Sequence, residues 1–273
     1  MDIEARVDFN HPVFQAPANA DATIWRYVDF TRLVSLLDTA RLFFARTDTL
    51  DDPFEGATSQ FNVVTRPDIY KGVYDQIQWE ALARYRQAER RYTFVNCWNL
   101  SEWESAALWG LYVPAGGGVA IKSSFQRLTE CFGPLCPQPT DGDGVQRIYI
   151  GRVQYLDYAR EWLPEGNGFY PYVHKRRSFQ FENEVRALIQ QGVAREYYEG
   201  TGDPSKQLDD YLDDSPPYLG LSPKIDLVRL MEAVHVSPTA PGWFFELTRS
   251  VVQKYGLDPN LVVQSEMADG PMY

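Results

Sequence analysis

The chain has 273 residues, which suits one large domain or two small ones and buries a sizeable core without disulfides. Its 26 Lys and Arg against 37 Asp and Glu give a net charge of 26 − 37 = −11, which excludes a generally basic surface for nonspecific binding of duplex nucleic acid. Three cysteines without paired CxxC motifs, no basic and apolar start, and no apolar run of ~18 residues predict a reduced, cytoplasmic protein with no signal peptide and no membrane span.

The first half of the chain is predicted to begin with an arm and then to mix strands and helices. Pro, Ala and Asn are frequent in residues 1–22, which we interpret as an N-terminal arm, and residues 23–273 as one α+β domain. Apolar spacing predicts strands at 24–28, 42–46, 93–99 and 119–123, and helices at 30–40, 68–91 and 101–112. One face of the predicted helix 68–91 is an apolar stripe, expected to pack against the core, that consists of Ile69, Val73, Ile77 and Leu82.

The second half continues this mixture. We predict an exposed loop at 131–144, strands at 147–158, 182–190 and 261–265, a helical segment at 169–179, an acidic surface loop at 196–215, and mixed signals at 225–236. A helix at 241–255 is predicted to stop at Gly256, because glycine is common just after a helix end. No repeat or linker is visible, so the expected fold is a single α+β domain with small mixed or antiparallel sheets flanked by helices.

An acidic motif, DDPFEG, precedes the predicted helix 68–91. Asp52, Pro53 and Glu55 have the spacing of a helix start, with Asp52 as N-cap, Pro53 in the first position and Glu55 bonding back to the cap. The functional alternative adds Asp48 and Asp51 to make an acidic loop that binds a divalent cation through oxygen ligands. No calcium-loop spacing is present, and the three widely separated histidines predict neither a His metal site nor a His-centred triad.

The motif SEWESAALWGLY has two interpretations. Ser101 and Glu104 have the spacing of a capping box, and Ser105, Trp109 and Tyr112 then fall on one helical face. The simpler interpretation is a core helix with aromatic packing. The functional one turns Ser105 and Trp109 toward a cleft, where the indole stacks on a nucleobase or nicotinamide.

The motif FENEVRALI is the strongest functional candidate. Strand alternation places Val185, Ala187 and Ile189 on the core face. Glu182, Glu184 and Arg186 then share the other face, where two carboxylates repel unless a cation separates them. Arg186 can supply that charge, and so can the basic run at 175–177. The alternatives are a glutamate kept ionised beside a ligand and a solvated, salt-bridged strand.

The chain resembles a bacterial and phage family catalogued as a domain of unknown function. The resemblance rests on the ordered motifs WRYVDF, LFFARTDTLDDPFEG, NCWNLSEWESAALWGLY, VAIKS, FENEVRALI and KYGLDPNLVVQS, from residue 25 to residue 265. In layout this family is similar to ADP-ribosyltransferases of the DNA-modifying toxin branch, which bind NAD between two halves of a split sheet.

That resemblance implies a set of site residues. Glu184 would be the catalytic glutamate of the late strand. Arg26 and Tyr27 of the first strand and Arg46 after LFFA would bind NAD. Further cofactor contacts are expected from Trp98, Ser105, Trp109 and Arg186. The usual first-strand histidine is absent here, and the Ser-Thr-Ser strand is not apparent.

Three hypotheses follow. The first is an NAD-dependent ADP-ribosyltransferase, of the toxin or phage-defence kind, that modifies a nucleic acid or a protein. The second is a non-catalytic module that binds a nucleotide or a peptide in a Trp-rich cleft. The third is a metal-dependent hydrolase or nuclease that uses carboxylates of both acidic motifs, namely Asp48, Asp52, Glu55, Glu182 and Glu184.

Overall fold

The structure is a computed structural model that describes residues 2–113, 117–133, 145–193, 205 and 207–268. Its strands are β1 (Asp2–Ile3), β2 (Ala5–Val7), β3 (Thr23–Asp29), β4 (Phe44–Arg46), β5 (Thr93–Leu100), β6 (Gly118–Ser124), β7 (Gln146–Arg152), β8 (Gln154–Leu156), β9 (His174–Arg176), β10 (Glu184–Gln190), β11 (Gly220–Pro223), β12 (Ala233–Val236) and β13 (Val262–Gln264). Its helices are α1 (Phe30–Thr39), α2 (Gln60–Ile69), α3 (Gln76–Glu89), α4 (Ala106–Tyr112), α5 (Phe125–Glu130), α7 (Leu208–Asp213), α8 (Leu227–Leu230) and α9 (Gly242–Lys254), with 3₁₀ turns that include η3 (Tyr170–Tyr172) and η4 (Arg177–Glu182).

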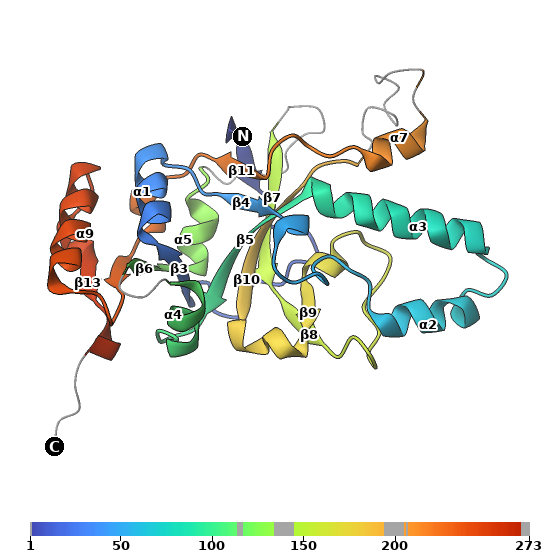
Figure 1. Cartoon of the computed structure of the whole chain (residues 1–273), viewed down its shortest axis with the longest axis horizontal. Helices are drawn as coiled ribbons and strands as arrows, with labels where there is room; N and C mark the ends of the chain where they lie inside the picture. The colour runs from blue at the N-terminus through green and yellow to red at the C-terminus, as the bar shows by residue number, and fades with distance from the viewer. Residues whose placement is uncertain (1, 114–116, 134–144, 194–204, 206, 269–273) are drawn as a thin grey trace.

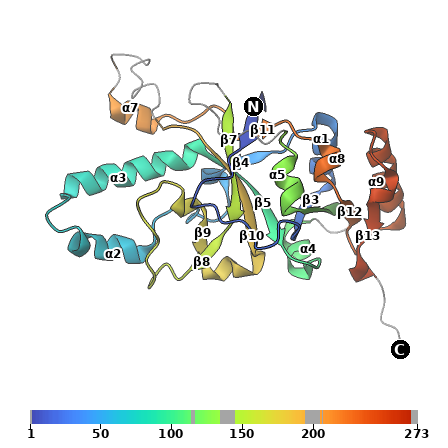
Figure 2. The same ribbon diagram turned by 180° about the vertical axis from the view of Figure 1, so that it is seen from behind.

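One mixed sheet of eleven described strands organises the chain, and β8 and β9 form a separate parallel pair. Helices flank the sheet, so the predicted α+β class is confirmed (Figure 1). The segment 1–22, predicted as an arm, contributes two short strands: β1 pairs with β11 and β2 with β7, both in parallel. Figures 1 and 2 show α2 and α3 extending from one end of the sheet, with α9 at the opposite end.

The sheet divides at β5. On one edge, β5 pairs with β10 along its whole length. On the other edge, its first half pairs with β4 through residues 94–95, and its last residues pair with β3 through residues 99–100. Residues 96–98 of β5 therefore lie between two diverging branches, one continuing through β4 to β11 and the other through β3 to β6. We call this opening the fork.

Two side chains close the fork. Arg26 Nη1 donates to the backbone oxygen of Cys97 over 2.7 Å, and Asn96 Nδ2 donates to the backbone oxygen of Phe43 over 2.8 Å. The Arg26 guanidinium also lies 6.0 Å from the ring centroid of Trp98. Backbone groups that lack a strand partner at the fork are thus satisfied by side chains, as buried polar groups require.

The two faces of the sheet carry different cores. One face packs against α1, α5, α8 and α9 and includes Val185, Ala187 and Ile189, so the predicted core face of β10 is confirmed. The opposite face is covered in two places. A cluster around Tyr149 and Tyr172 packs over β5, β7 and β10, and the α4 helix packs over β3 and β6. Glu184 and Arg186 lie on this second face, which is covered by protein and not by solvent.

Several predicted helices differ from the structure. The segment 68–91 contains the end of α2 and then α3, separated by a turn at Gly72, whose φ of +79° suits glycine and breaks a helix. The predicted stripe is not a core face, because Ile69, Val73 and Ile77 are exposed. The segment 169–179 is not a helix but two 3₁₀ turns flanking β9, and the strand 147–158 is interrupted at Val153.

Other predictions match. The helix predicted at 241–255 is α9, and Gly256 follows with a φ of +82°. Residues 225–236 contain both α8 and β12, as the mixed signals indicated. Most of the predicted loops 131–144 and 196–215, with Cys136, lies outside the described residues, although 208–213 form α7. In the described part of the chain, no helix combines the length and apolar character needed to cross a bilayer.

Candidate functional site

Arg186 is the centre of a buried network of charged side chains at the start of β10. Its side chain is fully buried. Its Nε and Nη2 donate to the two oxygens of Glu184 over 2.6 and 3.1 Å. Its Nη1 and Nη2 donate to the two oxygens of Glu55, the second over 3.2 Å, and Nη1 also donates to the backbone oxygen of Tyr172. A guanidinium can satisfy two carboxylates in this way because its five N–H groups form a planar fork.

Lys175 of β9 extends the network toward the surface. Its Nζ donates to Glu182 Oε2 over 2.6 Å and to Glu184 Oε2 over 3.0 Å, so one ammonium joins both carboxylates of FENEVR. Tyr112 of α4 donates its hydroxyl to Glu182 Oε1 over 2.7 Å. We refer to Glu55, Lys175, Glu182, Glu184 and Arg186 as the charged cluster.

The backbone explains how Glu182 and Glu184 reach the same ammonium. Glu182 ends η4, and Asn183 adopts a left-handed conformation with φ of +36° before β10 begins. The prediction that the two glutamates share one face of a strand is therefore wrong, because only Glu184 belongs to β10. The prediction that a cation must separate their charges is nevertheless met by Lys175, which pairs with both glutamates, whereas Arg186 pairs with Glu184.

The charges of the cluster set its protonation. Burial alone raises the pKa of Glu184, but the adjacent Arg186 and Lys175 outweigh burial and lower that pKa to about 2. Burial lowers the pKa of Lys175, and the charge of Glu184 more than offsets it, so the pKa is raised. The pKa of Arg186 is raised for the same reason, by Glu184 and Glu55. Glu184 is thus an anion, and Lys175 and Arg186 are cations, at physiological pH.

The DDPFEG motif forms a tight turn over this cluster and does not start a helix. Asp52 bonds to Arg176 over 2.7 Å, and the Phe54 ring lies 4.2 Å from the Arg176 guanidinium. Glu55 points inward to Arg186, so it cannot bond back to Asp52 as a capping residue would. Helix α2 begins later, with Ser59 as its N-cap. The N-cap prediction for Asp52 is therefore wrong. Its Oδ1 accepts from the Phe54 backbone N–H over 3.0 Å, but the chain makes a turn there, and α2 begins only at Gln60.

Gly56 ends this turn in close contact with the core. Its φ is +71°, and a Cβ added there would lie 2.4 Å from Tyr172 Cε1. Tyr172 is fully buried, so the ring has no room to move away. Glycine is required at this position for both its backbone conformation and its size.

The other predicted cofactor residues lie in three separate places. Arg26 and Trp98 meet at the fork, where burial lowers the pKa of Arg26 to about 10. Arg46 is paired with Asp48 over 2.7 Å and donates to the backbone oxygens of Pro216 and Tyr218, at the far end of β5. The structure thus brings Arg186 to Glu184 and keeps Arg46 in an ion pair of its own.

Tyr27, Ser105 and Trp109 form the third group, under α4. The Tyr27 hydroxyl accepts from the Ser105 backbone N–H over 2.7 Å, and the Tyr27 and Trp109 rings meet edge to face at 5.1 Å. Trp109 is 5% exposed and packs in the core, as the simpler interpretation of this helix predicted. The N-cap of α4 is Ser105, so the capping box predicted from Ser101 and Glu104 is wrong.

Glu104 instead bonds to side chains from two segments that lie far from it in the sequence. Its carboxylate accepts from Trp109 Nε1 over 2.9 Å, lies 2.7 Å from His235 Nδ1, and accepts from the Ser265 hydroxyl. Burial raises the pKa of Glu104, but these hydrogen bonds outweigh it and lower the pKa to about 2. His235 lies on β12 and Ser265 follows β13, so Glu104 fixes α4 to the end of the sheet.

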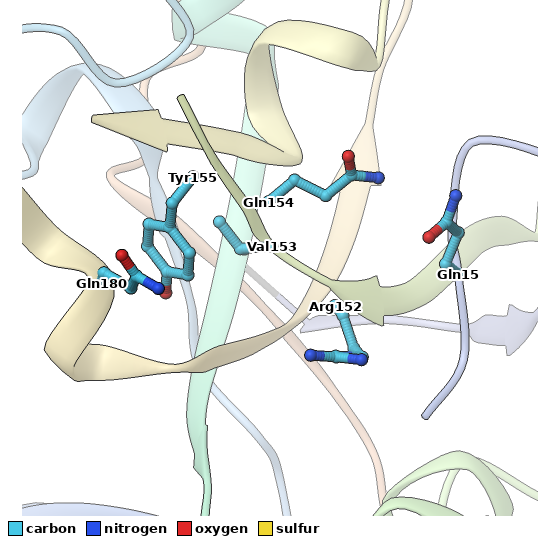
Figure 3. Close-up of a pocket in the computed structure, with 6 residues that line it drawn as sticks. All are labelled: Gln15, Arg152, Val153, Gln154, Tyr155 and Gln180. Carbon is cyan, nitrogen blue, oxygen red and sulfur yellow. The ribbon is translucent and has the colours of Figure 1, made fainter. Parts of the chain in front are cut away.

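A small polar cavity lies on the other side of Glu184. It has a volume of about 260 Å³ and is lined by residues of the β7–β8 bend, η4 and the N-terminal segment: Gln15, Arg152, Val153, Gln154, Tyr155 and Gln180 (Figure 3). The Tyr155 hydroxyl accepts from the Glu184 backbone N–H over 2.9 Å, which joins the cavity wall to the charged cluster.

The carboxylates of the metal-hydrolase hypothesis all have cationic partners. Each lies within ion-pair distance of an arginine or lysine, in the pairs Asp48–Arg46, Asp52–Arg176, Glu55–Arg186, Glu182–Lys175 and Glu184–Arg186. Among the described residues, no three His, Cys, Asp or Glu side chains are arranged to hold a metal ion. A metal bound there would compete with a protein cation at every ligand.

Comparisons of the chain with protein-family models, with curated proteins and with solved structures found no match.

Proposed function

We propose that the chain is an NAD-dependent ADP-ribosyltransferase with its reaction centre at the Glu182–Glu184 end of the charged cluster. The observation that carries the proposal is the pair of carboxylates held on Lys175. The cluster contains two cationic and three anionic side chains, a formal charge of 2 − 3 = −1. A fixed negative charge in a buried site stabilises a transition state in which positive charge develops.

ADP-ribosyl transfer has this electrostatic requirement. The bond from nicotinamide nitrogen to ribose C1′ breaks with its electron pair on nitrogen, while a nucleophilic atom of the acceptor bonds to C1′ and releases its proton. The chain's own part is to hold an ionised carboxylate beside the positive sugar and to accept a ribose hydroxyl hydrogen bond. Glu182 is the more accessible of the two for this contact, since its side chain is 11% exposed and that of Glu184 only 3%.

An unpaired acceptor beside the two glutamates fits a hydroxyl-bearing ligand. Asn99 is opposite Glu184 in the β5–β10 ladder, and its Nδ2 donates to the backbone oxygen of Glu182 over 2.6 Å. Its Oδ1 is buried and has no hydrogen-bond partner in the described structure. Buried polar atoms without partners are uncommon, and a ligand hydroxyl supplies the missing donor.

The surroundings of Glu182 also suit a flat ring. Tyr112 and Phe181 are each half exposed beside it, and exposed aromatic faces can stack on a nicotinamide or an adenine. We expect the acceptor to be a protein or a nucleic acid held by a limited local contact, because the net charge of −11 opposes broad binding to nucleic acid.

One observation favours a second candidate, a non-catalytic nucleotide-binding module. Both oxygens of Glu184 are already bound to cations, which is the arrangement expected of a structural ion pair. In that case Glu182 and Asn99 would form a binding surface, and ligand would bind without release of nicotinamide.

The test is an incubation with NAD labelled in its ADP-ribose part, with separate protein, DNA and RNA acceptors. The variants are Glu182→Gln and Glu184→Gln, with Glu246→Gln, a largely exposed glutamate of α9, as the control. We expect each cluster variant to lower label transfer and nicotinamide release by about 10²- to 10³-fold, as the loss of one electrostatic contact to the transition state does, and the control to be unchanged.

Circular dichroism of each variant separates loss of chemistry from loss of fold. Glu182→Gln is the more informative change, because Glu182 lies at the outer end of the cluster and keeps the Glu184–Arg186–Glu55 pairs intact. Nicotinamide release that is absent from the wild type with every acceptor, while NAD binds, would support the binding module and end the transferase proposal.

A further inference from the structure

The cavity at the β7–β8 bend has a wall of polar side chains that the rest of the protein leaves unpaired. Arg152, the last residue of β7, is exposed, and its guanidinium has no hydrogen-bond or ion-pair partner among the described residues. The side-chain amides of Gln15, Gln154 and Gln180 likewise bond to no described group. In Figure 3, Tyr155 and Gln180 lie on one side of the β7–β8 backbone, Gln154 and Gln15 lie on the other, and the Arg152 guanidinium lies below the bend.

Tyr155 adds an oriented donor. Because its oxygen accepts from the Glu184 backbone N–H over 2.9 Å, its own O–H hydrogen remains to be donated, and no described residue accepts it. Burial raises the pKa of Tyr155, and the nearby charge of Glu184 raises it further, so the hydroxyl stays protonated at physiological pH. The side chain is therefore a neutral donor held in place by the backbone of β10.

Charge and size define what this wall recognises. Of the described residues that line the cavity, Arg152 is the only one with a charged side chain at neutral pH, and none carries a carboxylate. The combination of one guanidinium, one hydroxyl and several amide donors suits an oxyanion, because arginine binds phosphate and carboxylate through parallel N–H bonds. The volume of about 260 Å³ lies just below the roughly 300–1,000 Å³ of pockets for drug-sized ligands, which suits a small ligand.

We propose that this cavity is a binding site for the phosphate group of a small phosphomonoester, with Arg152 and Tyr155 as the phosphate ligands and the glutamine amides around the remainder of the molecule. The tetrahedral phosphate offers more acceptor oxygens than a carboxylate, which matches a wall that presents donors from β7, β8 and η4 together. The site adjoins the Glu182–Glu184 centre, since the Tyr155 hydroxyl accepts from the Glu184 backbone N–H and the Val153 backbone N–H donates to the Glu184 backbone oxygen, each over 2.9 Å. The two share no side chain, because no member of the charged cluster is among the described residues that line the cavity.

The experiment is a calorimetric titration of the full chain with ribose 5-phosphate, inorganic phosphate and ribose, at constant ionic strength and without NAD. We expect saturable binding of both phosphates, with ribose 5-phosphate tighter because the glutamine amides contact its sugar, and no binding of ribose. Equal affinity of the two phosphates would contradict the assignment to a phosphomonoester. Absence of saturable phosphate binding, or binding of ribose as tight as that of its phosphate, would overturn the whole proposal.

Two variants and a matched control locate the binding. Arg152→Gln removes the charge and should weaken phosphate binding by about 10-fold or more, the usual loss for a hydrogen bond to a charged group. Tyr155→Phe removes the O–H donor and should weaken it by about 3- to 10-fold. Arg160→Gln, the same change at another exposed arginine that does not line the cavity, should leave the affinity unchanged. Equal affinities in all three variants would contradict the site, whether or not the chain transfers ADP-ribose.

Discussion

The ionised state of Glu184 makes the stability of the protein depend on pH in a way that can be calculated. The pKa of Glu184 is lowered from 4.5 to about 2 in the folded chain. A depressed carboxylate pKa stabilises the folded state above the unfolded pKa, and that contribution is lost as the pH falls through the folded pKa. With about 1.4 kcal/mol per pKa unit, this lowering of the pKa contributes ~3 kcal/mol at pH 7.

The same linkage gives the contribution at lower pH. At pH 3, where the unfolded carboxyl is protonated and the folded one is still mostly ionised, about half of this contribution remains. The perturbation is Glu184→Gln, which cannot ionise. The free energy of unfolding of the wild type should therefore exceed that of the variant by ~3 kcal/mol at pH 7, and by about half that at pH 3.

Urea unfolding followed by tryptophan fluorescence at pH 7, 5, 4 and 3 measures this difference directly. Buried Trp98 lies on the neighbouring strand β5 and reports on the packing there. Glu246→Gln should match the wild type at every pH, since this glutamate is largely exposed. A difference between wild type and Glu184→Gln that is constant from pH 7 to pH 3 would refute the conclusion that Arg186 and Lys175 keep Glu184 ionised.

Two further substitutions test the contacts around the site. Gly56→Ala should lower the free energy of unfolding by about 1–3 kcal/mol, because the new methyl group would contact Tyr172 at a residue whose φ is positive. Gly72 has a similar φ but no atom within 4 Å of an added Cβ, so Gly72→Ala should lower the free energy of unfolding less in the same urea titration. His235→Leu should lower the free energy of unfolding by about 1.5–3 kcal/mol, because it removes a hydrogen-bond donor from ionised Glu104. His235→Asn keeps a donor near the Nδ1 position and should lower the free energy of unfolding clearly less. Equal losses within either pair would contradict the contact assigned to it.

The parts of the fold that could be predicted are those set by local pattern. Alternation in FENEVRALI placed Val185, Ala187 and Ile189 on the main core face, because strand periodicity fixes which side chains share a face. The helix before Gly256 was predictable from its apolar spacing and the glycine that ends it.

The charged cluster depended on contacts that local pattern does not contain. Glu55 has the spacing of a capping residue, and only the position of Arg186, 131 residues later, shows that its carboxylate turns inward. Lys175 lies in a segment whose composition favoured a helix, and β9 pairing with β8 is what directs it to both glutamates. The pairing of Glu104 with His235 likewise joins residues that are 131 positions apart.

The division of the sheet at β5 has a mechanical consequence. The β4 branch and the β3 branch are both hydrogen bonded to β5 but not to each other at residues 96–98. A change in the angle between the branches would stretch the Arg26–Cys97 and Asn96–Phe43 bonds while every strand ladder stayed intact. Such a motion would also shear the core that Phe44 of one branch and Ile121 of the other share, and it would move α4, with Tyr112, relative to Glu182.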